Sequence, residues 1–136
     1  MAANRKVELL SAVPLFAGCS KRELGQIALV TDELDVPAGK TLMRQGQRGH
    51  EFMVIESGCV SIIRNARETR RLGDGEWVGE IALIAQVPRT ATVTTLTPTR
   101  ILVLTDRAFA KLVRDMPSIA QKVLRSVGER LAADAV

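Results

Sequence analysis

The fold of this chain is decided by residues 79–91, which read GEIALIAQVPRTA. Gly79 leads a short helical start, and Glu80 supplies a carboxylate that can accept hydrogen bonds from hydroxyl groups. Arg89 is a permanent cation whose planar donor fork suits phosphate, and Thr90 adds a hydroxyl beside it. Backbone N–H groups at the start of the helix also favour an anion. These groups together indicate a site that holds a sugar and a phosphate.

The composition predicts one globular domain of 136 residues, of which 46% are apolar and 25% are charged. Only 3% are aromatic, so the core must rest on Val, Ile, Leu and Ala, and base stacking on aromatic platforms has almost no residues to use. The formal charge of +4 suits an anionic ligand. Because the basic residues are scattered, they give little support to a nucleic-acid footprint.

Neither a metal centre nor a membrane anchor is expected. Cys19 and Cys59 form no CxxC pair, and His50 is the only histidine, so we expect no metal ligands. The two cysteines are expected to be small, buried or half-buried residues in a reducing cytoplasm. Arg5 and Lys6 interrupt any apolar signal sequence, and no stretch is long enough to span a bilayer.

Both ends of the chain are predicted to be helical. Apolar spacing predicts helices over about residues 4–31, where Ser20 and Glu23 form a capping box. After the β-rich region, Asp106 is expected to cap a helix and Pro117 to begin another that ends near residue 133. Most of that last helix is expected to pack on the core, and the alternative is a lid over the open mouth of the strands.

The middle of the chain, residues 34–105, alternates short β-rich segments with Gly, Pro, Asp and Asn. We expect a mostly β fold with flanking helices, in which eight antiparallel strands close into a β-roll, or jelly roll, without exposed edges. The predicted strands are Leu34–Val36, Thr41–Arg44, Phe52–Glu56, Cys59–Arg64, Glu68–Leu72, Trp77–Val78, Ala91–Thr95 and Arg100–Thr105.

In this β-rich context, the GEIALI and PRTATV segments closely resemble the phosphate-binding cassette of the cyclic nucleotide-binding domain family. That family includes the effector domains of catabolite-activator-type regulators, protein kinase A regulatory subunits and cyclic-nucleotide-gated channels. The resemblance covers nearly the whole chain, residues 1–136, and supporting segments read PAG, RQG, FMVIESG and GDGEWVG. It implies a binding module and not an enzyme.

The resemblance implies a role for each matched residue. Glu80 would accept from the ribose 2′-hydroxyl, and Arg89 would pair with the cyclic phosphate. Thr90 would bond the phosphate and, in a syn ligand, a guanine amino group. Ile62 would touch the base from inside the roll, and Arg130 on the last helix would approach the ribose and Glu80. The remaining expected ligand-binding residues are Gly79, Ile81, Ala82, Leu83 and Ala91.

The resulting expectation is a cyclic nucleotide sensor without a cofactor, in which movement of the last helix relays binding. The resemblance to bacterial members favours cAMP over cGMP as the ligand. The last helix is also expected to be the surface for a homodimer or an effector protein. No helix-turn-helix follows it, so no DNA-reading motif is expected. The alternatives are a ligand-free interaction module of the same fold and a nucleic-acid-binding protein.

Overall fold

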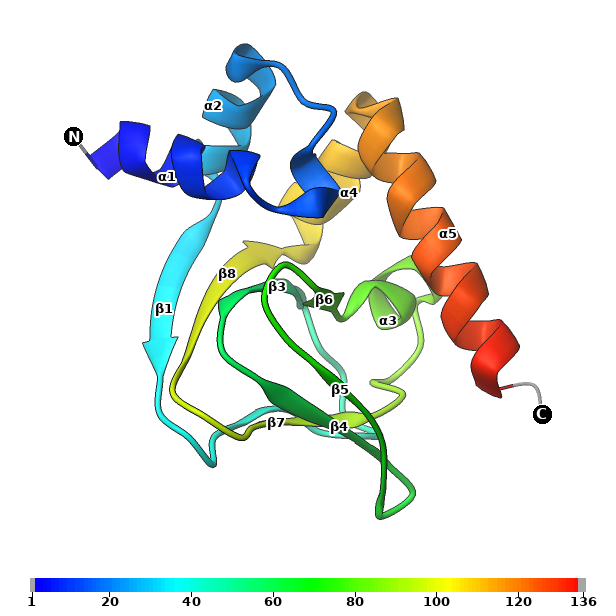
Figure 1. Cartoon of the computed structure of the whole chain (residues 1–136). Helices are drawn as coiled ribbons and strands as arrows, with labels where there is room; N and C mark the ends of the chain where they lie inside the picture. Colours follow the sequence, from blue (N-terminus) through cyan, green and yellow to red (C-terminus); the bar gives the residue numbers. More distant parts are fainter. Residues whose placement is uncertain (1, 135–136) are drawn as a thin grey trace.

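The computed structural model describes residues 2–134, and its centre is a roll of two four-stranded antiparallel sheets. One sheet has the strand order β1-β8-β3-β6, and the other has the order β2-β7-β4-β5. Figure 1 shows α1, α2 and α4 above the roll, and α5 running down one side past α3. The predicted mostly β architecture, an eight-stranded roll with flanking helices, is confirmed.

The strands lie where the β-rich segments predict them, and each end falls within two residues of its expected place. They are β1 (Asp32–Val36), β2 (Thr41–Met43), β3 (Glu51–Ser57), β4 (Val60–Arg64), β5 (Arg67–Leu72), β6 (Trp77–Val78), β7 (Thr92–Thr95) and β8 (Thr99–Thr105). The first strand begins earlier than predicted because its charged residues form ion pairs at the sheet surface instead of packing in a core. Arg100 contacts both Glu33 and Asp35 there, and Arg5 also contacts Glu33.

The helices flank this roll in chain order. They are α1 (Ala2–Ser11), the 3₁₀ turn η1 (Pro14–Phe16), α2 (Lys21–Leu29), α3 (Glu80–Ala85), α4 (Asp106–Asp115) and α5 (Pro117–Asp134). The capping box of Ser20 and Glu23 is present. No helix between residues 2 and 134 has the length and apolar character that a bilayer crossing needs.

The predicted cap of α4 is wrong by one residue. Thr105, and not Asp106, is the N-cap, because it keeps the extended backbone of β8 and its hydroxyl accepts from the Ala108 N–H. Asp106 is the first helical residue, where its carboxylate favours the positive end of the helix dipole.

The core consists of two clusters that share β3 and β8. Successive side chains of a strand point to opposite faces, so Phe52 and Val54 pack among the helices, whereas Met53 and Ile55 face the interior of the roll. Phe52 stacks on Phe109 of α4, with ring centroids 4.5 Å apart. The helices are therefore fixed to the outer face of the first sheet, and the hollow of the roll lies on its inner face.

Candidate functional site

The segment 79–91 begins with a sharp backbone turn. Gly79 has a φ of 100° and precedes the first residue of α3. A Cβ at Gly79 would lie 2.9 Å from the carbonyl oxygen of Glu51 and 3.0 Å from Nη1 of Arg89. Only glycine combines that backbone conformation with so close an approach. The turn thereby places α3 against the start of β3, with Glu80 facing inward.

A hollow of about 650 Å³, including its opening to solvent, lies between the second sheet, α3 and α5. Nine of the ten predicted site residues line it: Ile62, Gly79, Glu80, Ile81, Ala82, Arg89, Thr90, Ala91 and Arg130. The tenth, Leu83, lies outside this hollow and packs against the core cluster beneath the helices.

Glu80 is the most buried polar residue of the hollow, with 0% of its surface exposed. Its Oε1 accepts from the guanidinium of Arg130 and from the Ser126 hydroxyl at 3.5 Å, and both donors come from α5. Its Oε2 is buried and has no hydrogen-bond partner in the described part of the chain. Burial raises the pKa of Glu80, and the charge of Arg130 opposes that rise. One carboxylate oxygen is therefore left to accept from a ligand hydroxyl.

Arg130 ties α5 to this carboxylate and to the strand before it. Besides Glu80, it donates to the carbonyl oxygen of Trp77 in β6. Higher on α5, Nζ of Lys122 donates to the carbonyl oxygen of Pro14 at 2.7 Å. The helix is thus attached at the pocket and again at the N-terminal helical region.

Arg89 is also buried, with 6% of its surface exposed. Its guanidinium donates to the carbonyl oxygens of Glu51 at 2.7 Å and Gly79 at 3.3 Å. Burial lowers the pKa of Arg89, and the charges of Glu51 and Glu80 oppose this shift. An arginine has five N–H donors, so this anchored group keeps donors for an anion in the hollow.

Gly49 is a support for Arg89 that sequence reasoning missed. A Cβ built on Gly49 would lie only 1.9 Å from Nε of Arg89, so the guanidinium packs directly against this backbone. Gly49 does not have a positive φ, so its backbone conformation alone does not require glycine. Only the fold brings residue 49 against residue 89.

Part of the lining of the hollow is apolar. Ile62, Leu72 and Val93 line it from three neighbouring strands of the second sheet. Met43 and Val78 complete the apolar wall. The lining therefore offers three kinds of group: a carboxylate held by α5, a cation held at the start of β3, and apolar side chains around Ile62.

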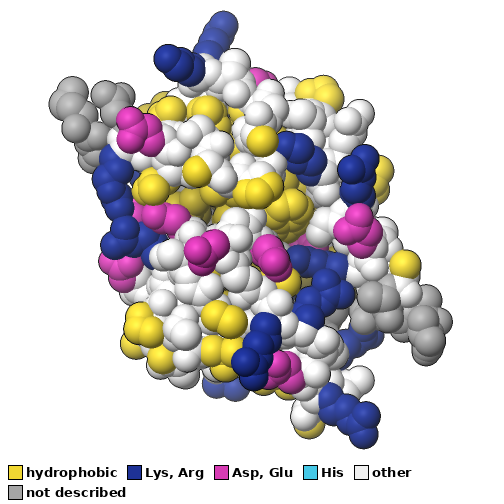
Figure 2. Space-filling model, in the orientation of Figure 1, with side chains coloured by type: hydrophobic (Ala, Val, Ile, Leu, Met, Phe, Trp, Pro, Cys, Tyr) yellow, Lys and Arg dark blue, Asp and Glu magenta, His cyan; other side chains and the backbone are white. Residues whose placement is uncertain are grey.

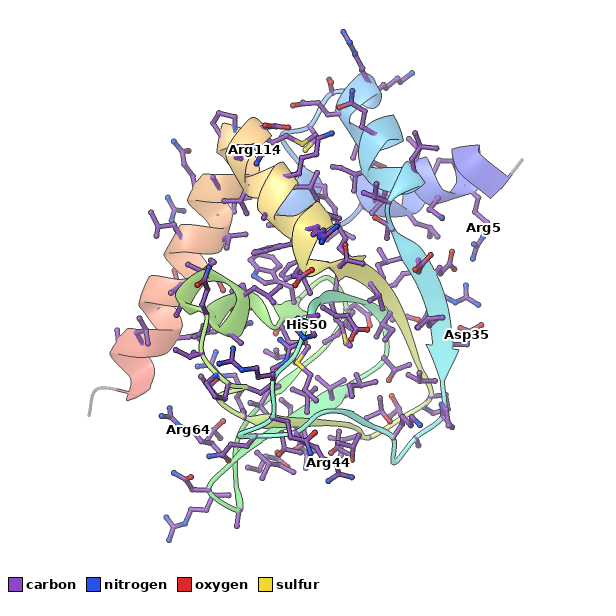
Figure 3. All side chains as sticks on the ribbon, turned by 180° about the vertical axis from the view of Figure 1, so that it is seen from behind. Arg5, Asp35, Arg44, His50, Arg64 and Arg114 are labelled. Atoms are coloured by element: carbon purple, nitrogen blue, oxygen red, sulfur yellow. The ribbon has the colours of Figure 1, made fainter. Side chains whose placement is uncertain are left out.

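The β4–β5 hairpin contributes polar side chains that sequence reasoning also missed. Arg64, Thr69 and Arg70 line the hollow. The pairing of Ile62 with Arg70 across the two strands puts both side chains on the same face. A sequence prediction of this register, added to the inward orientation expected of Ile62, would identify Arg70. Figure 3 shows Arg64 at the far end of this hairpin.

The surroundings of the hollow are basic. Figure 2 shows Lys and Arg side chains gathered between α5 and the strands beneath it. The outer groove on this side is lined by Arg70, Lys122, Arg125 and Arg130, with Glu76 and Glu129 beside them. This excess of positive charge suits an anionic ligand.

The single histidine and the two cysteines do not line the hollow. His50 lies in the loop before β3, with 74% of its side chain exposed, and contacts the Asp106 carboxylate at 3.2 Å. Cys19 and Cys59 are free and half-buried, as predicted. Within residues 2–134, no three His, Cys, Asp or Glu side chains gather as a metal site would require.

We compared the sequence and the fold of this chain with those of known proteins. Residues 33–116 match the cyclic nucleotide-binding domain family. The cyclic nucleotide-gated potassium channel mll3241 of Mesorhizobium japonicum is 34% identical over 131 residues, which cover 96% of this chain and 36% of the channel. The cGMP-dependent protein kinase egl-4 of Caenorhabditis briggsae is 33% identical over 120 residues, which cover 83% of this chain and 16% of the kinase.

Solved structures share the fold at lower identity. The regulatory domain of Toxoplasma gondii PKA, co-crystallised with cAMP, superposes with a TM-score of 0.83 at 23% identity, over 94% of this chain and 50% of that one. The chain spans less than two thirds of the length of each of these three proteins. The family match runs through both sheets and includes the whole 79–91 segment. The chain belongs to the cyclic nucleotide-binding domain family.

Proposed function

We propose that residues 1–136 form one regulatory domain that binds a cyclic nucleotide monophosphate and has no catalytic activity of its own. The observation that carries this proposal is the unpartnered Oε2 of Glu80, which is buried beside the hollow. A buried carboxylate oxygen without a donor is costly, and a ribose 2′-hydroxyl would supply that donor. Arg89 lines the same hollow at the cationic region.

The remaining ligand contacts follow from the regions of the hollow. The cyclic phosphate would lie against Arg89 and Thr90, with backbone N–H groups of the first turn of α3 nearby. The ribose would lie against Glu80, and the base would lie against the apolar side chains around Ile62. The other site residues, Gly79, Ile81, Ala82, Ala91 and Arg130, would shape the pocket around the sugar and phosphate. Leu83 would act through the packing of α3 and not through direct contact.

We further propose that cAMP is preferred over cGMP and that the domain acts in the cytoplasm. The fold shared with a regulatory domain solved with cAMP supports the first point. The similarity to a cGMP-dependent kinase is the reason to test both nucleotides. Two free cysteines suit a reducing compartment.

Binding would be relayed through α5. A ligand hydroxyl that donates to Glu80 would change the contacts that Arg130 and Ser126 make with the same carboxylate. Because both donors are on α5, the equilibrium position of α5 would change with them. The partner surface for this output would also be on α5, where Leu124 and Leu131 are 69% and 54% exposed. A second copy of the chain or an effector protein could cover these side chains.

The alternative is a ligand-free interaction module of the same fold. One observation favours it: Arg89 and Glu80 already have protein partners, namely two backbone carbonyls and Arg130. In that case the two charges would serve only to hold α3, β3 and α5 together.

Isothermal titration with cAMP and with cGMP separates the two functions. We expect saturable binding of at least one nucleotide to the wild-type chain and a loss of about 100-fold or more in Arg89→Ala, because a charge-assisted phosphate contact disappears. Arg44→Ala is the matched control, since Arg44 is exposed and lies outside the lining of the hollow. Wild-type protein that binds neither nucleotide would support the interaction module instead.

A further inference from the structure

A second hollow also borders Arg89, and we call it the loop hollow. It is lined by β2, by the loop that follows β2 and by the start of β3. Met43 and Arg89 line both this hollow and the first one. Because Arg89 is only 6% exposed, one buried guanidinium borders two openings. The polar side chains of the loop hollow are Thr41, Arg44, Gln47, Arg48, Glu51 and Arg89.

Positive charge dominates the loop hollow. Three arginine side chains line it beside a single carboxylate, that of Glu51. Arg44 and Arg48 are exposed, and their side chains have no hydrogen-bond or ion-pair partner in the described part of the chain. Arginine donates hydrogen bonds but cannot accept them. The lining therefore offers an anion several donors and two cations that no side chain neutralises.

The loop that carries these arginines is attached directly to Arg89. The Gly46 N–H donates to the carbonyl oxygen of Arg89 at 2.8 Å, and the Arg89 N–H donates to the carbonyl oxygen of Gln47 at 2.9 Å. The guanidinium in turn donates to the carbonyl oxygen of Glu51 at 2.7 Å. The loop hollow is therefore held in shape by hydrogen bonds of the protein itself, which lowers the cost of ordering it around a ligand.

A phosphate-class oxyanion is the ligand that this lining fits. Guanidinium groups bind phosphate oxygens through charge-assisted and often bidentate hydrogen bonds. Leu42 and Met43 are the only apolar side chains among the lining residues. The loop hollow thus has little surface on which a base or an acyl chain could pack, and it suits a small ion better than either.

We propose that the loop hollow is a second anion site, in which Arg44, Arg48 and Arg89 bind a free phosphate-class oxyanion. The nucleotide pocket and this site both use the charge of Arg89. Two anions that share one cation repel each other, so phosphate in the loop hollow weakens nucleotide binding. By linkage, the nucleotide weakens phosphate binding by the same factor. Only this coupling rests on the proposed function, and phosphate binding by itself does not.

Phosphate binding is measured first, on the nucleotide-free protein. Phosphorus NMR titration with inorganic phosphate should show saturable binding to wild type and a loss of about 10-fold or more in the double variant Arg44→Ala with Arg48→Ala. The matched control is Lys21→Ala with Arg22→Ala, which removes two exposed cations outside both hollows. It should leave phosphate affinity unchanged when sodium chloride keeps the ionic strength constant.

Glu51→Gln tests the charge of the site in the opposite direction. It removes the one carboxylate of the lining and keeps the backbone carbonyl that holds Arg89. We expect phosphate affinity to rise about 3-fold, because an unfavourable charge next to the anion disappears. A fall in phosphate affinity would contradict an electrostatic site.

The coupling is measured by calorimetric titration with cAMP and with cGMP at rising phosphate concentration. If phosphate occupies a separate site, the apparent Kd of the nucleotide should rise about 5-fold and then level off. Displacement of the nucleotide from the first hollow would instead raise the Kd without limit. In the double variant Arg44→Ala with Arg48→Ala, nucleotide affinity without phosphate should stay within about 2-fold of wild type, and the effect of phosphate should disappear.

Three results would overturn the inference while nucleotide binding, and with it the proposed function, stays intact. They are the absence of saturable phosphate binding to wild type, equal phosphate affinity in wild type and the double arginine variant, and a nucleotide Kd that rises without limit. A chain that binds phosphate through Arg44 and Arg48 but binds neither nucleotide would support the anion site and overturn the proposed function.

Discussion

Glu80 and Arg89 are both buried, yet they are held in different ways. Glu80 depends on a side-chain cation from another element, whereas Arg89 depends on backbone carbonyls of Glu51 and Gly79. A buried charge without a partner costs several kcal/mol. Substitutions near either group are therefore expected to change stability and ligand affinity together, and each experiment should measure both.

Gly49→Ala should weaken nucleotide binding without touching a predicted ligand contact. The new methyl group would stand 1.9 Å from Nε of Arg89, so the guanidinium must shift away from its place. Overpacking of this kind costs about 1–3 kcal/mol of stability, and we expect affinity to fall about 10-fold as the donor geometry is lost. Titration calorimetry and urea unfolding would measure the two effects.

The control for that substitution is Gly25→Ala in α2. A Cβ at Gly25 meets no atom within 4 Å, so alanine should stabilise the helix by about 0.5–1 kcal/mol and leave binding unchanged. If Gly49→Ala bound nucleotide as tightly as wild type, the backbone at residue 49 would not position Arg89 for the ligand.

Glu56→Gln should stabilise the protein in a pH-dependent way. Oε2 of Glu56 is buried without a hydrogen-bond partner in the described chain, and burial, followed by the charge of Glu33, raises the pKa of this carboxyl above its ordinary 4.5. The folded state therefore binds the proton more tightly than the unfolded state does. The cost of ionising Glu56 is present at neutral pH and is relieved as the pH falls through the folded pKa towards the unfolded value.

Glutamine copies the protonated carboxyl, so the variant should be more stable than wild type near pH 7. This difference should shrink as the pH falls towards 4.5, the ordinary value for the carboxyl. Urea unfolding midpoints of both proteins, taken across that range, measure the difference. A gain in stability that did not vary with pH would show that ionisation of Glu56 is not its cause.

At the scale of whole elements, α5 is attached to the pocket mainly through Arg130. Glu80 is fully buried and the side chain of Arg130 is 17% exposed, so Arg130→Ala would leave a buried carboxylate without its cation. Breaking such a pair costs about 3–5 kcal/mol, measured as the free energy of unfolding. Arg125→Ala, on the same helix but in the outer groove, should change stability by about 0.5 kcal/mol or less.

The double variant Glu80→Gln with Arg130→Ala tests whether the cost comes from the unpaired charge. If it does, removing both charges should restore much of the stability lost in Arg130→Ala, because the two effects are not additive for contacting residues. Losses that simply added would mean that Arg130 stabilises α5 by packing alone.

The elements themselves could be predicted well because each has a local signal. Alternating β-rich segments separated by Gly, Pro, Asp and Asn identified the strands, and the Ser20–Glu23 pair identified the start of α2. The cap of α4 was misplaced because Thr105 and Asp106 are both good capping residues, and only the backbone at the end of β8 selects between them.

The site could be predicted only as far as its motif extends. Glu80 and Arg89 belong to one recognisable segment, but the groups that hold them come from distant parts of the chain. The carbonyl of Glu51 leaves no trace in sequence, because every residue has one. Gly49 and Arg70 were missed for a similar reason: their roles depend on strand register and on a contact 40 residues away in the chain.

At the scale of the whole molecule, the pocket, α5 and the N-terminal helices form one connected path. Glu80 contacts Arg130, and Lys122 on the same helix contacts Pro14. A nucleotide that binds the cassette should therefore slow hydrogen exchange in α3 and change exchange along α5. In Arg130→Ala, exchange in α3 should still respond to the nucleotide while α5 no longer does.

That comparison requires peptide-resolved hydrogen exchange with saturating nucleotide. Lys122→Ala serves as a second variant, because it removes the contact with Pro14 and leaves the pocket untouched. It should keep the response of α5 near the pocket and lose it towards η1 (Pro14–Phe16). An α5 response of full size in Arg130→Ala would rule out the Glu80–Arg130 contact as the link.

The fluorescence of Trp77 can report on the position of α5. It is the only tryptophan of the chain, it lines the groove beside α5, and its carbonyl oxygen accepts from Arg130. A change in the position of α5 would alter the polarity around the indole ring and so shift its fluorescence emission. The unlabelled protein therefore contains its own spectroscopic probe of ligand occupancy, which would let stopped-flow mixing follow nucleotide arrival in real time.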